Sequence, residues 1–159
     1  RNFPEKINLL KHYGYIGAFL ISLFGNGSIF LPATVLPILT SLSLTFFPVT
    51  GILGPVFIAI AGGAGAALGE TVGYTLGYSG RKIIIKKKTY TRFELWVRRW
   101  GAITIFVFSF VPFFFDFVGL AAGALHFPLW KFILISFIGR TIFYFCVFLV
   151  TIFGVMKLF

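Results

Sequence analysis

Long apolar runs, interrupted by a few single charges, dominate the chain. No Asp, Glu, Lys or Arg occurs between His12 and Glu70. The runs are continuous rather than alternating, which is typical of helices that satisfy their own backbone in lipid and not of barrel strands. The pattern therefore predicts an all-α integral membrane protein.

The first apolar stretch, residues 13–44, is too long for one straight crossing of a ~30 Å hydrocarbon core at ~1.5 Å per residue. It contains the turn-forming run from Gly25 to Ser28 and the helix-breaking Pro32 and Pro37. We interpret it as a re-entrant hairpin, with a kinked crossing as the alternative. A short amphipathic helix is expected before it, over residues 2–12.

The later stretches follow the same plan. Residues 46–78 and 101–125 are each interrupted by proline, whereas residues 132–156 form an uninterrupted final span. Residues 56–78, which follow the interruptions of the 46–78 stretch, are expected to form a helix. Residues 101–125 are the second candidate re-entrant hairpin. The interrupting residues are Pro48, Gly54, Pro55 and Pro112.

Two segments, 69–74 and 139–144, share the pattern Gly-charge-Thr-x-x-Tyr. Each half opens with an aromatic residue before a glycine, Gly14 or Gly101, and the basic segment ends one half and begins the other. This arrangement favours inverted-topology repeats. We expect one transmembrane domain over 1–159, with two repeats that each combine a proline-broken re-entrant hairpin and a spanning helix. The expected boundaries are 1–79 for the first repeat, 80–100 for a basic loop and 101–159 for the second repeat.

Glycines recur at every fourth position late in the 46–78 stretch. On a helix they form a smooth ridge that admits a second helix closely. The next ridge carries Glu70 and Tyr74, so Glu70 should face the interior of the bundle. The glycines are Gly65, Gly69, Gly73 and Gly77.

Composition agrees with a membrane class. Of 159 residues, 58% are hydrophobic and 11% are charged, against about 45–50% and 25% in soluble domains. The net charge of +10 is concentrated between Arg81 and Arg99. Such a segment is expected on the cytoplasmic side, where each basic residue attracts anionic lipid by about 1 kcal/mol; nucleic-acid binding is not favoured. The residues expected to attract headgroups are Lys86, Lys87, Lys88, Arg98 and Arg99.

Three charges lie where charge is costly: Glu70, Asp116 and Arg140. A charge at the centre of a membrane helix costs about 2.5–3.5 kcal/mol, so these residues are candidates for a substrate or proton site, with a purely structural role as the alternative. We hypothesise that Arg140 pairs with either Glu70 or Asp116. Asn26 is as suited to capping a turn as to contacting substrate. No metal-ligand spacing, cofactor motif or nucleophile–base pair is visible, so we expect neither a cofactor nor an enzyme.

The stretch Gly65-Ala66-Ala67-Leu68-Gly69-Glu70-Thr71-Val72-Gly73-Tyr74, followed by Gly77 and Gly80-Arg81, resembles the first signature of the DedA family, also called SNARE-associated Golgi protein-like or VTT-domain. Pro112 to Asp116, with Gly119 to Gly123, resembles its second motif. The resemblance implies two opposed re-entrant hairpins and translocation of phospholipids or polyprenyl phosphates. It matches Glu70 to the acidic position of the first signature and Pro112 to the proline of the second hairpin.

The chain also departs from the family pattern. Gly25-Asn26 and Pro32-Ala33-Thr34 stand where many bacterial members carry acids, and Ser109 and Phe115 stand where many carry arginines. Fewer fixed charges would suit an uncoupled scramblase. We therefore keep Asn26, Thr34 and Tyr74 as further candidates at the substrate or proton site, and Pro32 and Pro112 as the hairpin breaks.

Four functions follow from these observations. The first is a lipid flippase or scramblase in which membrane lipids are the partners; the second is a proton- or ion-coupled transporter of small solutes. A membrane-embedded enzyme and a structural assembly factor are less favoured. We expect a multi-pass protein of a prokaryotic cell membrane, and the glycine ridges would also suit a homo-oligomer. Because the chain begins with Arg1, we expect that an upstream segment was removed.

Overall fold

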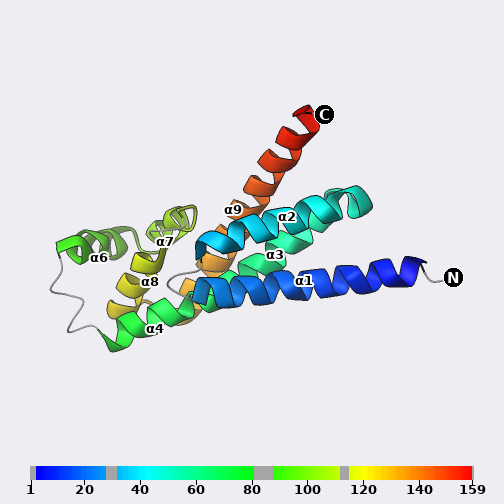
Figure 1. The fold of residues 1–159 in the computed structure, drawn as a ribbon. Coiled ribbons are helices and arrows are strands. Elements are labelled where there is room, and N and C mark those ends of the chain that lie inside the picture. The colour runs from blue at the N-terminus through cyan, green and yellow to red at the C-terminus, as the bar shows by residue number, and fades with distance from the viewer. Residues whose placement is uncertain (1–2, 28–31, 81–87, 112–114, 159) are drawn as a thin grey trace.

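The computed structural model describes residues 3–27, 32–80, 88–111 and 115–158 (Figure 1). Every regular element in these ranges is an α-helix. The all-α class predicted from the continuous apolar runs is therefore confirmed for the described part. The helices are α1 (Phe3–Gly27), α2 (Pro32–Thr50), α3 (Leu53–Gly69), α4 (Thr71–Ser79), α6 (Lys88–Trp100), α7 (Ala102–Phe108), α8 (Phe115–Ala124) and α9 (Leu129–Leu158).

Within the described residues, two helices are long and apolar enough to cross a membrane. One is the nearly continuous unit of α3 and α4, Leu53–Ser79 with 27 residues, and the other is α9 over Leu129–Lys157 with 29 residues. At ~1.5 Å per residue each exceeds a ~30 Å hydrocarbon core. In contrast, α7 has 7 residues and α8 has 10, so neither can cross alone. Much of the outer surface is apolar, as lipid contact requires; Phe24 and Val150 are 69% and 74% exposed.

The prediction of a separate helix over residues 2–12 is wrong, because α1 runs without a break from Phe3 to Gly27. Gly14 lies inside α1, where the ring of Phe46 from α2 packs against it. The helix therefore continues through the position at which the first half was expected to open. Gly101, by contrast, has a positive φ of 46° and separates α6 from α7, so the two glycines are not structurally equivalent.

The break between α2 and α3 lies between the two predicted positions. Helix α2 includes both Pro37 and Pro48 and ends at Thr50. Gly51 then adopts a φ of 60°, the left-handed conformation that commonly ends helices. Pro55 falls in the first turn of α3, where a missing N–H costs no helical hydrogen bond. Pro48 and Pro55 therefore flank the turn, whereas the positive φ of Gly51 forms it.

Helix α3 lies at the centre of one group of helices, and α1, α2 and α9 all pack on it. A Cβ on Gly65 or Gly69 would collide with backbone atoms of α1, and one on Gly77 would collide with α8. The predicted glycine ridge is thus confirmed as a surface of close helix contact. It admits two different helices, α1 along α3 and α8 along α4.

Helix α9 contributes to two of the apolar clusters formed by the described residues. The first joins α1, α2, α3 and α9 around Leu39, Ile58 and Phe148. The second joins α4, α7, α8 and α9 around Ile105, Val118 and Phe132. In Figure 1, α1 to α3 therefore form one group and α4 with α6 to α8 form another, with α9 packed against both.

Candidate functional site

A buried ion pair lies where the two groups of helices meet. Arg140 Nε on α9 donates to Glu70 Oε1, at the junction of α3 and α4, over 2.6 Å. Each side chain is 2% exposed. Of the two pairings considered for Arg140, the one with Glu70 is confirmed. Since a buried charge must be compensated, this contact fixes α9 against the α3–α4 unit.

Glu70 occupies a small irregularity between α3 and α4. Its N–H donates to Ala66 O at 2.9 Å, and its own carbonyl accepts from Tyr74 N at 3.2 Å. Its ψ of −17° lies outside the usual α-helical value and close to that of a 3₁₀ turn. The helix axis therefore continues through Glu70, and the side chain is held by backbone bonds on both sides.

Small residues on both sides of α9 let Arg140 approach Glu70. Thr141 packs on Gly63 of α3, because a Cβ on Gly63 would collide with the backbone and hydroxyl of Thr141. Gly139 packs on Ser109, the residue that follows α7; a Cβ there would lie 2.6 Å from Ser109 Cβ. Helix α9 is thus enclosed between α3 and α7 at the level of the ion pair. The hydroxyl of Ser109 donates to Ile105 O at 2.8 Å.

Asn26 lies next to this site at the end of α1. Its Nδ2 donates to Ser22 O at 2.9 Å and to Tyr144 Oη at 3.3 Å, and the side chain is buried. Tyr144 is one turn after Arg140 on α9, and the last turn of α1 touches Gly69. Asn26 therefore joins α1 to α9 beside the ion pair. The partners Ser22 and Tyr144 were not predicted as site residues, although helical spacing from Asn26 and Arg140 was a usable signal.

Tyr74 contacts the turn between α8 and α9. Its hydroxyl donates to Phe127 O, and its ring lies 5.4 Å from that of Phe132 between centroids. Tyr78, one turn further, contacts the ring of His126 edge to face at 4.3 Å. The structure thus gives Tyr74 a contact that ties α4 to the start of α9.

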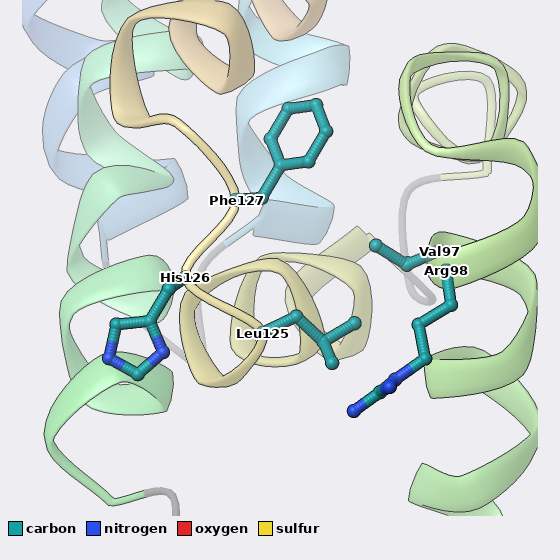
Figure 2. Close-up of a pocket in the computed structure, with 5 residues that line it drawn as sticks. All are labelled: Val97, Arg98, Leu125, His126 and Phe127. Atoms are coloured by element: carbon teal, nitrogen blue, oxygen red, sulfur yellow. The ribbon is translucent and has the colours of Figure 1, made fainter.

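The turn after α8 is a Schellman motif. Phe127 N donates to Ala122 O at 2.9 Å and His126 N donates to Gly123 O at 3.0 Å, while His126 has a φ of 56°. A pocket of about 330 Å³ lies between this turn and α6. In Figure 2, Arg98 extends from α6 beside Leu125, whereas the His126 ring points away toward α4. Arg98 is therefore placed near the C-terminal end of α8, where a cation is favourable.

The remaining predicted residues are placed by their helices where the structure describes them. Thr34 is exposed in the first turn of α2, and Arg99 is exposed on α6. Asp116 lies in the first turn of α8. Pro32 and Lys88 are the first residues of α2 and α6. Outside the described residues lie Pro112, Lys86 and Lys87.

Three buried hydroxyls were also missed from the sequence. Ser43, Ser136 and Thr141 bury their side-chain oxygens without a hydrogen-bond partner among the described residues. Ser136 lies one turn before Arg140 on α9 and is 0% exposed. Within the same described ranges, no group of three or more His, Cys, Asp or Glu side chains could hold a metal ion.

These features define a helical membrane protein with a buried arginine–carboxylate pair between its two longest apolar helices. The family model of the VTT domain matches residues 31–153, and the chain belongs to this family, that of the DedA and SNARE-associated Golgi proteins. The match includes both Glu70 and Arg140. Neither a curated protein nor a solved structure matches the chain.

Proposed function

We propose that this protein moves lipid headgroups across the membrane, as a flippase or scramblase for phospholipids or polyprenyl phosphates. The observation that carries the proposal is the buried ion pair between Glu70 and Arg140. Membership of the VTT-domain family supports a transporter-like role. The site itself supports a phosphate-bearing substrate for the following reasons.

A guanidinium group is permanently charged and matches the oxygens of a phosphate with two parallel N–H donors. In apolar surroundings Arg140 needs an anion at all times. Glu70 supplies that anion when no lipid is present, and a headgroup phosphate could take its place during passage. The pair therefore suits a substrate that carries negative charge next to long apolar chains.

Nearby small and hydroxylated residues would help a headgroup to pass. Asn26 and Tyr144 offer amide and hydroxyl groups next to the pair, and Ser136 offers a buried hydroxyl one turn away. These groups can replace part of the water that surrounds a headgroup at the membrane surface. We further propose that α7 and α8 form a re-entrant hairpin, because neither is long enough to cross, and that the basic segment with α6 faces the cytoplasm of a prokaryotic cell.

The test is reconstitution into liposomes that carry fluorescent phosphatidylglycerol, phosphatidylcholine or a polyprenyl phosphate in both leaflets. A membrane-impermeant reductant bleaches the outer leaflet, and protein-dependent loss of the protected half reports transbilayer movement. We expect movement of at least one phosphate lipid. Arg140→Gln should abolish it, whereas Ser41→Ala should not, because that exposed hydroxyl bonds within α2.

Folded protein that moves none of these lipids would contradict the proposal. The second candidate, a transporter of small solutes coupled to protons or ions, is favoured by the same buried carboxylate, since Glu70 could carry a proton. Uptake of a soluble solute into vesicles under a pH gradient, without lipid movement, would support that alternative instead.

A further inference from the structure

A second site lies on the outer surface, at the corner between α6 and α7. There an apolar pocket of about 310 Å³ opens to the surroundings. Its volume is at the lower end of the range for small-molecule sites, about 300–1,000 Å³. It is separate from the Glu70–Arg140 pair and from the pocket shown in Figure 2. Its lining residues are Trp96, Trp100, Ile103, Thr104, Val107 and Phe108.

The corner is held in a fixed shape. Gly101 takes a positive φ of 46° between the two helices, and its N–H donates to Val97 O at 2.9 Å. On the α7 side, Thr104 Oγ1 donates to Trp96 O at 3.0 Å. Trp96 also packs against Phe108, with 5.8 Å between ring centroids. The pocket is therefore a built feature rather than a gap between loosely placed helices.

The position of α6 explains which residues surround the pocket. Val97 is buried against α8, so the opposite side of α6 faces outward. Both tryptophans of the pocket are more than half exposed, and Arg92 and Arg99 are exposed on the same helix. In helical register Arg92 lies four residues before Trp96 and Arg99 lies three residues after it, so both border the row of tryptophans. Tryptophan and arginine together are typical of the headgroup level of a membrane.

From this arrangement we propose that the corner of α6 and α7 binds one phospholipid with an anionic headgroup. An acyl chain would occupy the apolar pocket beside Ile103 and Val107, and the phosphate would lie on Arg99. The choice of an anionic lipid rests on charge complementarity, since the rim is basic and the lining is aromatic and aliphatic. The two neighbouring arginines lie on different sides of α6. Arg98 is on the side that faces α8, whereas Arg99 is exposed on the outer side.

This inference goes beyond the proposed transport function, because it concerns an equilibrium binding site that requires no lipid movement. The pocket contains its own reporters, Trp96 and Trp100. In the full chain carrying Trp130→Phe, these two are the remaining tryptophans. Lipids brominated in the acyl chain quench them only on close contact, so quenching in mixed vesicles gives the relative affinity of brominated phosphatidylglycerol and brominated phosphatidylcholine.

We expect phosphatidylglycerol to bind about fivefold more tightly than phosphatidylcholine, because its headgroup carries a net negative charge, whereas the choline cation of phosphatidylcholine neutralises its phosphate. Arg99→Gln should bring this ratio close to one. The matched control is Lys157→Gln, which removes the same charge from the exposed C-terminal end of α9 and should leave the ratio unchanged.

A second pair of variants tests the pocket without changing charge. Val107 is 54% exposed, so Val107→Phe should be tolerated and should fill part of the pocket. The concentration of either brominated lipid that gives half-maximal quenching should therefore rise about tenfold. Val150→Phe, at a position on α9 that is 74% exposed, should have no effect. Equal affinity for the two lipids in the parent protein would overturn the proposal, as would a preference that survives Arg99→Gln or quenching that survives Val107→Phe.

Discussion

Removal of one partner from the Glu70–Arg140 pair should destabilise the protein strongly, whereas replacement of both should not. The two side chains are 2% exposed and bond over 2.6 Å. With the charge centres about 4 Å apart and an effective dielectric constant of about 20, their attraction is about 4 kcal/mol. A lone charge left in the bundle then costs about 3–5 kcal/mol.

The two single variants should differ in magnitude. Glu70→Gln leaves a guanidinium that stays charged at all accessible pH values, so the cost should lie near the upper end of this range. Arg140→Met leaves a carboxyl, which can take up a proton and become neutral, so the cost should lie near the lower end. The double variant leaves no buried charge. Its stability should return to within about 1 kcal/mol of the parent protein, since well-packed neutral residues can replace a buried ion pair.

Unfolding by SDS in mixed micelles, followed by circular dichroism, measures these free energies. With single costs of about 5 and about 3 kcal/mol and a double cost of about 1 kcal/mol, the expected coupling energy of the cycle is about 7 kcal/mol in magnitude. Arg92→Met, at an exposed arginine on α6, is the control, with a cost of less than about 0.5 kcal/mol. Lipid movement in liposomes should be lost in the double variant despite its recovered stability. If the two single effects simply add, Glu70 and Arg140 do not stabilise one another and the reasoning fails.

Three further changes test how the helices are held. Gly69→Ala places a methyl group against the backbone of α1 and should lower the free energy of SDS unfolding by about 2 kcal/mol. The control is Gly17→Ala, whose methyl group meets open space and should be neutral or stabilise by up to about 1 kcal/mol. Equal effects of the two changes would contradict the close contact between α3 and α1. Gly51→Ala should cost about 1–2 kcal/mol, because φ is 60° there, and an unchanged unfolding midpoint would argue against that turn. Tyr74→Phe removes the hydrogen bond to Phe127 O and should lower the free energy of SDS unfolding by about 0.5–1.5 kcal/mol. An unchanged free energy would indicate that the hydroxyl bonds to solvent instead.

The sequence was sufficient for the helical class, the glycine ridge and one of the two pairings offered for Arg140, because each depends on a local rule. Continuous apolar runs must form helices in lipid, and a charged side chain within such a run requires a partner of opposite charge. The ends of the helices could not be predicted as well. Pro37 and Pro48 are both exposed and lie inside α2, and α1 continues through Gly14, on which the ring of Phe46 packs. Helical spacing places Ser22 one turn before Asn26 and Tyr144 one turn after Arg140. The bond between Asn26 and Tyr144, however, depends on how α1 meets α9, which no local pattern encodes.

Two polar links join the α3–α4 unit to α9, and together they limit which helices can move. The Glu70–Arg140 pair holds the middle of α9, and the bond from the Tyr74 hydroxyl to Phe127 O holds the turn at its start. Because both attachments join the same two helices, sliding α9 along α4 by one turn would break both and leave a buried charge without compensation. Helices α7 and α8 are short, with 7 and 10 residues. In the transport that we propose, we therefore expect α3, α4 and α9 to stay together as one unit while a headgroup passes.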